Sequence, residues 1–410
     1  MAKISILIGG HLCTAPRPQK EADVLASAGH NVTVYGVWFD SELVRRDRMI
    51  TASKSWTFKP VLDFRSQYRF TRWQVRLKAR LAKEIYQKTG RFSPYLLGYG
   101  AFSMLNAARY AKADLTIVHS ELGLWVGSHL IDEGFCIGVD FEDWFSEDLP
   151  PQARIARPIA YLKVLEAKLL HNCEYCLTTS YALADTMART YLAPKPKVVY
   201  NAFPWEERKH IDGQTKDRKN LELASIHWFS QTIGPGRGIE MLMEALPYLA
   251  HFAEIHLRGN YTDSVRQWLE PQIPPEWKQY VFIHSTVPSD DLLSRISEHD
   301  IGLALETADI KSRNFTVTNK LFQYLQAGLA ISATNTTGQR EIFSAYSEIG
   351  ILLHRNTSRA LASAINGFLN SPTNLSNAKA ASLNAAQTTF NWECEASKIA
   401  QLAELVLTKV

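Results

Sequence analysis

The chain has 410 residues, of which 46% are hydrophobic and 21% are charged, as in ordinary globular proteins. At about 100–200 residues per domain, this length predicts two or three domains whose cores need no disulfide or structural metal. The net charge of +4 is too small to indicate a nucleic-acid-binding protein. Five scattered cysteines, no secretory signal and no long apolar run predict a reduced, cytoplasmic protein without a membrane span.

The first half of the chain alternates short apolar strands with helices. The first strand ends at Gly9-Gly10, and the first helix ends at Gly29, a position where glycine can adopt a positive φ. Strands are expected at 3–8, 31–35, 114–118, 135–139, 174–179 and 197–200, and helices at 19–28, 124–131 and 156–170. This alternation predicts a doubly wound parallel sheet.

A second alternating region follows a strongly polar stretch. Residues 206–220 include four acidic residues and five Lys or Arg, a composition typical of a linker. Strands are then expected at 223–229, 254–258, 281–284, 300–305 and 329–333, and helices at 239–249, 320–327 and 378–410. The sequence therefore predicts an α/β protein with two Rossmann-like domains that face each other across a cleft.

The expected boundaries follow from these two regions. Residues 1–204 would form the N-terminal, acceptor-side domain and 205–220 the linker. Residues 221–385 would form the nucleotide-sugar-binding domain, and a helix at 386–410 would cross back to the first domain.

Glycine-rich turns follow the first strand of each half. Gly9 and Gly10 would let backbone N–H groups approach a phosphate or sugar, although a tight strand-to-helix turn explains them equally well. In the second half, Gly234 and Gly236 precede Arg237 and a helix start, where free N–H groups and a guanidinium would suit a pyrophosphate. The alternative for this second turn is a solvated loop.

A third candidate is the helix that begins at Asn319-Lys320. A lysine in the first turn of a helix is unfavourable against the helix dipole, and a bound anion would explain its presence. The alternative is an ordinary surface lysine.

Four segments in the right order resemble family 4 (group 1) glycosyltransferases of the GT-B type. The run from Asn319 to Ile331 is similar to the "NKLFEYLAAGLPVI" segment of that family, and 232–240 is similar to its basic loop before a glycine. Residues 15–34 resemble its "DPRVxxEAxxLAxxGHxVTV" start, and 197–202 its "VVYNAP". The resemblance implies transfer of a sugar from a nucleotide-sugar to an acceptor hydroxyl, with retention and with neither metal nor cofactor, in cell-surface polysaccharide or glycolipid synthesis.

The resemblance also implies roles for individual residues. Arg237 and Lys320 would bind the donor phosphates. The other donor-binding positions would be Gly9, Gly10, Gly234, Gly236, Thr318, Asn319 and Gln323, and the acceptor-side positions Arg17, Asp140 and Asp143.

Three positions depart from the family pattern. Thr232 stands where many members have arginine, Gln323 where many have glutamate, and Glu142 where most have a histidine near the sugar. Glu142 could accept a hydrogen bond from a sugar hydroxyl or act as a base toward the acceptor, and is counted among the catalytic candidates. The loop from Asp140 to Asp143 could also be a solvated acidic loop.

The stretch 65–91 carries nine basic residues and one acidic residue. Its apolar positions Trp73, Leu77, Leu81 and Ile85 have helical spacing, which is typical of a helix lying on an anionic membrane. The alternatives are a domain helix with a solvated basic face and, less favoured, a nucleic-acid contact.

Two other functions fit the same architecture. A nucleotide-sugar epimerase would act on the donor without an acceptor. A nucleotide-sugar-binding protein without transferase activity would explain the departures at Thr232, Gln323 and Glu142.

Overall fold

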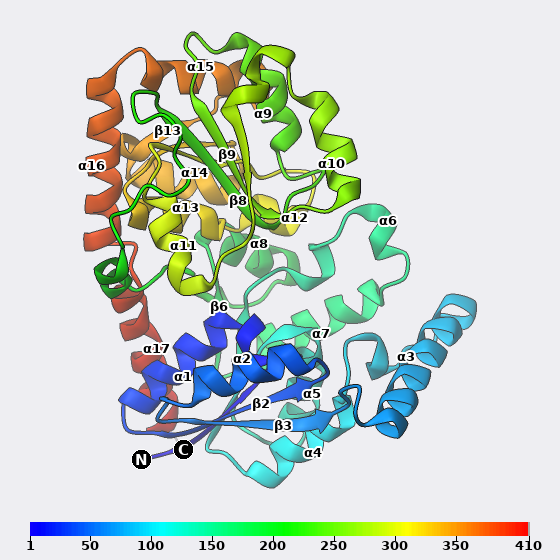
Figure 1. The fold of residues 1–410 in the computed structure, drawn as a ribbon. Coiled ribbons are helices and arrows are strands. Elements are labelled where there is room, and N and C mark those ends of the chain that lie inside the picture. The colour runs from blue at the N-terminus through cyan, green and yellow to red at the C-terminus, as the bar shows by residue number, and fades with distance from the viewer. Residues whose placement is uncertain (409–410) are drawn as a thin grey trace. The chain divides into compact units, whose positions relative to one another are not determined.

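The computed structural model describes residues 1–408, which divide into two compact units (Figure 1). Unit 1 comprises Met1–Val199 and the chain from Ala396 onward, and unit 2 comprises Tyr200–Glu395. Each unit is built on its own parallel sheet, as the alternation of strands and helices predicted.

Unit 1 contains a seven-stranded parallel sheet in the order β3-β2-β1-β4-β5-β6-β7. Its strands are β1 (Lys3–Leu7), β2 (Asn31–Trp38), β3 (Thr57–Asp63), β4 (Leu115–Val118), β5 (Ile137–Phe141), β6 (Tyr175–Thr178) and β7 (Lys197–Val198). Sequence patterning missed β3, which contains Pro60 and lies at the sheet edge, where a residue without an N–H is tolerated.

The helices of unit 1 cover this sheet, and α3 stands at the edge of the unit (Figure 1). They include α1 (Pro16–Ser27), α2 (Ser41–Thr51), α3 (Arg69–Thr89), α4 (Ala101–Ala111), α5 (Ser120–Asp132), α6 (Pro151–Arg154), α7 (Ile159–Asn172) and α8 (Tyr181–Tyr191). Across the described residues, no helix combines the length and apolar character that crossing a bilayer requires.

Unit 2 contains a six-stranded parallel sheet in the order β10-β9-β8-β11-β12-β13. Its strands are β8 (Ser225–Thr232), β9 (Glu254–Asn260), β10 (Val281–His284), β11 (Ile301–Ala304), β12 (Ala330–Ala333) and β13 (Gly350–Leu352). Its helices include α9 (Ile239–Ala245), α10 (Asp263–Leu269), α11 (Ser289–Ile296), α12 (Lys311–Phe315), α13 (Asn319–Ala327), α14 (Thr337–Ala345), α15 (Ser358–Leu369) and α16 (Pro372–Thr388). One face of this sheet carries the main apolar core, with Ile226, Trp228 and Leu303 packed among residues of α9 and α15.

The chain after residue 378 does not form the single helix expected there. Helix α16 ends at Thr388, and α17 (Trp392–Leu407) begins after a short break. Asn391 causes the break, because its side-chain oxygen accepts the backbone N–H of Cys394 and so begins a new helix. The residues of α17 from Ala396 group with unit 1.

The segment 205–220, expected as a linker, belongs to unit 2 and packs closely on its sheet. It begins with a short 3₁₀ helix, Trp205–His210. Further along, Asp217 pairs with Arg258 of β9, and Arg218 pairs with Glu254 at 2.7 Å, all four side chains being largely buried. Its polar composition therefore serves ion pairs on a polar sheet face rather than a solvated connection.

Candidate functional site

Two basic side chains of unit 2 lie against the same part of strand β8. Arg237 donates a hydrogen bond of 3.0 Å to Ser230 Oγ, and Lys320 Nζ lies 5.8 Å from the ring centre of Trp228. Trp228 and Ser230 are two residues apart near the carboxyl end of β8, so both cations contact the same short part of that strand. The fold therefore brings together the two residues that the sequence assigned to the donor phosphates.

Lys320 is held in place by a carboxylate that the sequence did not single out. Its Nζ lies 2.7 Å from Glu306 Oε1, and Thr318 donates a hydrogen bond of 3.0 Å to the same oxygen. The Lys320 and Glu306 side chains are only 14% and 15% exposed. Burial alone would raise the pKa of Glu306, but the charge and hydrogen bond of Lys320 outweigh it and lower that pKa. Lys320 is thus an ordered, paired cation rather than an ordinary surface lysine.

The loop before α9 has a backbone that two of its glycines make possible. Gly236 and Gly238 have φ angles of 70° and 83°, in the left-handed region that favours glycine. The Gly236 N–H donates to the Glu240 carboxylate at 2.7 Å, so an internal anion already occupies one of the loop amides. Gly234 is buried at the start of this turn.

Helix α13 is anchored so that its first turn stays at the sheet end. Tyr324 donates from its hydroxyl to the carbonyls of His227 and Leu303, at 3.1 and 3.3 Å. At the helix start, the exposed Asn319 accepts a 3.0 Å hydrogen bond from Asn201. Gln323, one turn further, is half-buried.

In unit 1, the Gly9-Gly10 turn lies at the carboxyl end of β1. It lies beside Ser120, the second residue after β4. A Cβ atom on Gly9 would come within 2.7 Å of Ser120 Oγ, so a close approach requires glycine there. Gly10 has open space where a Cβ would stand, and its carbonyl accepts the Val37 N–H at 2.9 Å.

Beside this turn lies a buried histidine between two carboxylates. His119 follows β4 directly and is 2% exposed. Its Nε2 lies 2.7 Å from Glu21 Oε2, and its Nδ1 lies 2.8 Å from Glu142 Oε1. Burial alone would lower the pKa of His119, but the hydrogen bonds to Glu142 and Glu21 raise it to about 10. Both ring nitrogens therefore carry protons at neutral pH and donate to the two carboxylates.

Glu142 is the more accessible of these two carboxylates, since its side chain is 30% exposed while that of Glu21 is fully buried. Burial alone would raise the pKa of Glu142, but the hydrogen bond and charge of His119 lower it overall. A carboxylate with a lowered pKa is a weaker base, so its geometry suits accepting a hydrogen bond better than removing a proton.

Arg17 and Asp140, both expected on the acceptor side, form a buried pair. Arg17 Nε donates to Asp140 Oδ2 at 2.5 Å, and both side chains are 1% exposed. Burial alone would lower the pKa of Arg17, but the Asp140 charge raises it, so the guanidinium stays charged. Arg17 also donates to the Val199 carbonyl at 2.8 Å and so connects helix α1 to the end of the sheet. Asp143, in contrast, is exposed.

Glu21, His119 and Asp140 each place one possible ligand atom within 4.8 Å of the others. Both ring nitrogens of His119 are engaged with Glu21 and Glu142 in this arrangement. Within residues 1–408, buried atoms without a hydrogen-bond partner remain around this cluster, namely Arg17 Nη2, Glu21 Oε1, Ser120 Oγ and Asp140 Oδ1.

Comparison with known proteins identifies the class. Residues 237–401 match the family model described as "Glycosyl transferase-like". Sucrose-phosphate synthase from Thermosynechococcus elongatus is 14% identical, with 100% of both chains covered and a TM-score of 0.67. HepE of Anabaena, solved with UDP and glucose, is 14% identical over 100% of both chains, with a TM-score of 0.69. WaaG, a glycosyltransferase involved in lipopolysaccharide biosynthesis, is 9% identical over 97% of this chain and 99% of its own, with a TM-score of 0.60.

No curated protein sequence matches the chain. The structural matches show the GT-B fold with two Rossmann-like domains, and the family model gives the activity. The chain is a glycosyltransferase, as the sequence resemblance predicted.

Proposed function

We propose that this glycosyltransferase takes a sugar from a nucleoside-diphosphate sugar, whose diphosphate binds Arg237 and Lys320. The observation that carries the proposal is that both cations lie against the same end of β8, with Lys320 held by Glu306. HepE, which shares the fold, was solved with UDP and with UDP-glucose. A diphosphate of that kind offers anionic oxygens to both a guanidinium and an ammonium group.

The chemistry required of Arg237 and Lys320 is electrostatic. As the bond between the sugar and the diphosphate breaks, negative charge grows on the leaving group, and fixed cations stabilise it. A nucleoside diphosphate leaves without a general acid, and in this proposal the two fixed cations take the place of a metal. Retention of configuration rests on the resemblance to family 4 enzymes.

Unit 1 carries groups of its own that suit a sugar. Glu142, fixed by the protonated His119, is suited to accept a hydrogen bond from a sugar hydroxyl. The Gly10 position leaves open space, so the Gly9-Gly10 backbone could approach a ligand closely.

The acceptor would be a hydroxyl of a cell-surface polysaccharide or glycolipid precursor. The involvement of WaaG in lipopolysaccharide biosynthesis supports this class. Cys13, Cys136, Cys173 and Cys176 are free thiols, which supports work in the reducing cytoplasm.

The first experiment is a donor screen by thermal shift and nucleotide release. One family of nucleoside-diphosphate sugars should raise the melting temperature and, with a suitable acceptor mixture, release nucleotide. Tight binding without release in any mixture would favour the non-catalytic alternative, and release without acceptor dependence would favour the epimerase.

Substitutions then test the role of the two cations. R237Q and K320Q should each lower kcat/KM by roughly 10²–10³-fold, as loss of a donor to a developing anion does. R266Q and K209Q are matched controls, because these cations are exposed on the same unit and should leave turnover unchanged. Full activity of both R237Q and K320Q, with circular dichroism like that of the parent, would refute the assignment.

A further inference from the structure

Helix α3 presents two adjacent stripes on its outward side. At 100° per residue, Arg69, Arg72, Arg76, Arg80 and Lys83 fall within one narrow sector of the helix. Next to it runs an apolar stripe, whose members are exposed by 70% (Phe70), 60% (Trp73), 37% (Leu77), 46% (Leu81) and 48% (Ile85). An outward apolar stripe of this length is unusual for a soluble surface.

The opposite side of α3 makes the contacts with unit 1. Ala82 is buried there, Val75 and Ala79 are half-buried, and Tyr86 donates a hydrogen bond of 3.1 Å to the Arg157 carbonyl. Apart from Tyr86, these residues have small or medium-sized side chains, so the five large apolar side chains of the outward stripe do not attach the helix to the unit. A domain helix with only a solvated basic face would show the reverse, with its large apolar residues turned inward.

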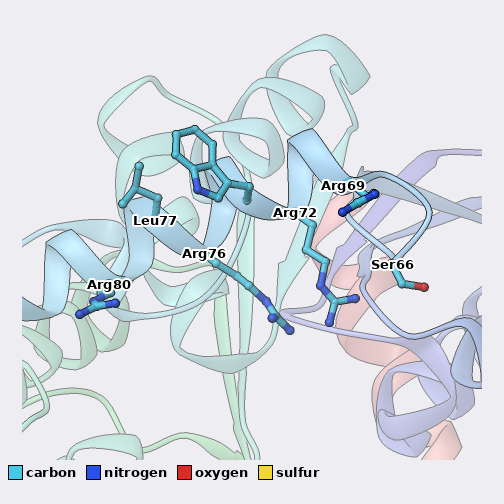
Figure 2. Close-up of a pocket in the computed structure, with 7 residues that line it drawn as sticks. Ser66, Arg69, Arg72, Arg76, Leu77 and Arg80 are labelled. Atoms are coloured by element: carbon cyan, nitrogen blue, oxygen red, sulfur yellow. The ribbon is translucent and has the colours of Figure 1, made fainter.

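The arginines and the apolar residues together border a hollow of about 540 Å³, lined by Ser66, Arg69, Arg72, Trp73, Arg76, Leu77 and Arg80. Figure 2 shows Arg72 and Arg76 extending to one side of the helix and Leu77 to the other, with Ser66 and Arg69 at one end. Guanidinium groups are suited to bind phosphate oxygens in pairs. The hollow therefore combines phosphate recognition with an apolar wall.

An anionic lipid surface offers phosphates for the arginines and, beside them, an apolar layer for the apolar stripe. The headgroup layer carries phosphates, and the acyl boundary beneath it accepts Trp, Phe and Leu side chains that lie flat along a helix. A purely acidic partner would pair with the arginines but leave the five apolar side chains in water.

We propose that the outward face of α3 binds an anionic bilayer surface, with the arginine stripe at the lipid phosphates and the apolar stripe in the interface. The helix then lies parallel to the membrane plane, as in a peripheral membrane protein. This inference does not depend on the identity of the donor.

The test is sedimentation of the full chain with vesicles, without any nucleotide-sugar. Vesicles of phosphatidylcholine with about 30 mol% phosphatidylglycerol should bind the protein, and phosphatidylcholine alone should bind it at least tenfold more weakly. Raising the salt to about 0.5 M should release it, because screening removes the electrostatic part. Inorganic phosphate at a matched ionic strength should compete no better than chloride.

Two double variants separate the stripes. R72Q/R76Q should lower the partition coefficient about 30-fold, at roughly fivefold per basic residue. W73S/L77S should lower it at least tenfold through lost apolar contact.

Each variant has a matched control on the same unit. R45Q/R46Q removes two exposed arginines from α2, and Y110S/L192S removes an exposed aromatic residue and an exposed leucine. Both controls should bind anionic vesicles like the parent chain.

The inference is overturned if the parent chain does not bind anionic vesicles at about 0.1 M salt, or if the α3 variants bind as well as their controls. Donor binding of R72Q/R76Q, measured by thermal shift, should match that of the parent. A loss of vesicle binding with intact donor binding therefore separates this inference from the proposed function.

Discussion

Gly302 shows how one missing side chain helps to fix helix α13 on the sheet of unit 2. It lies in the middle of β11, where the Tyr324 ring from α13 packs directly over its Cα atom. The Tyr324 hydroxyl then reaches the carbonyls of His227 and Leu303 on neighbouring strands. Helix α13, and with it Lys320, is thereby fixed against the sheet.

The G302A substitution should destabilise unit 2. The new Cβ would lie 2.4–2.7 Å from Tyr324 ring atoms, so the ring must move and its hydroxyl bonds must weaken. Overpacking of this kind costs about 2–3 kcal/mol in the free energy of unfolding, measured by urea denaturation. Turnover should fall as well, because Lys320 lies one turn away on the same helix.

Gly367 provides the matched control. It is exposed in α15, and a Cβ there would meet only Ile351 Cδ1 at an ordinary 3.4 Å. G367A should stabilise the chain by about 0.5–1 kcal/mol, since alanine is the better helix former. Equal effects of the two substitutions would show that Tyr324 packing does not decide the stability of β11.

At this scale the sequence could identify residues with a local signal. Arg237 stands in a glycine-rich turn, and Lys320 stands in the first turn of a helix, where a cation is unfavourable. Glu306, Glu21 and His119 have no such local signal, because their roles come from partners 14, 98 and 23 positions away. The one available indication was that His119 and Glu306 each follow a predicted strand, at the sheet end where ligands bind.

Among the elements, the segment 205–220 packs on a buried polar cluster on one face of the unit 2 sheet. Four histidine rings lie there within 4.5–5.2 Å of a neighbour, namely His227 (β8), His256 (β9), His284 (β10) and His299 before β11. Asp217 from the segment lies 3.3 Å from His284 and pairs with Arg258. Burial lowers the pKa of His256 to about 4 and lowers the pKa of the other three.

Unit 2 should therefore lose stability in acid. The unfolded chain takes up protons near pH 6.5, while the folded cluster resists them until about pH 4 for His256. The stability is complete above pH 6.5 and is lost as the pH falls from there toward 4. His256 alone should account for about 2 kcal/mol between pH 7 and pH 5.

The H256Q variant should remove that part of the acid sensitivity, measured as the difference in urea unfolding free energy between pH 7 and pH 5. Its amide can still bond to Glu254 and His284, which lie 3.2 and 2.9 Å from the histidine ring. H251Q changes an exposed histidine of the same unit and should leave the acid sensitivity intact. If H256Q lost as much unfolding free energy between pH 7 and pH 5 as the parent, the prediction would be contradicted.

The order of elements was more predictable than their ends. Strands β1, β2 and β4 and the helix at 320–327 could be predicted because apolar runs meet glycine or polar turns there. Strand β3 has a weak, half-exposed pattern, and the break between α16 and α17 depends on one Asn391 side chain. The polar composition of 205–220 predicted a linker, because the buried partners of this segment on β9 are distant in sequence.

On the scale of the whole molecule, the two units bury histidine in opposite charge states. Unit 1 holds His119 protonated between Glu21 and Glu142, with a pKa of about 10. Unit 2 holds four histidines neutral beside Arg258. Alkaline pH therefore lowers the stability of unit 1, and acidic pH lowers the stability of unit 2. The intact protein should be most stable near neutral pH.

Calorimetry from pH 5 to pH 9 should resolve this opposition as two transitions that respond in opposite directions. Stability from His119 is complete below pH 6.5 and is lost as the pH rises toward 10, by up to about 3 kcal/mol at pH 9. The melting temperature of unit 1 should therefore fall in alkali and that of unit 2 in acid. G302A, which destabilises unit 2, shows which transition belongs to that unit. H119Q should flatten the alkaline fall and leave the acid arm unchanged, whereas H171Q, at an exposed position of unit 1, should alter neither. An alkaline fall that persists in H119Q would mean that the buried imidazolium does not hold unit 1 together.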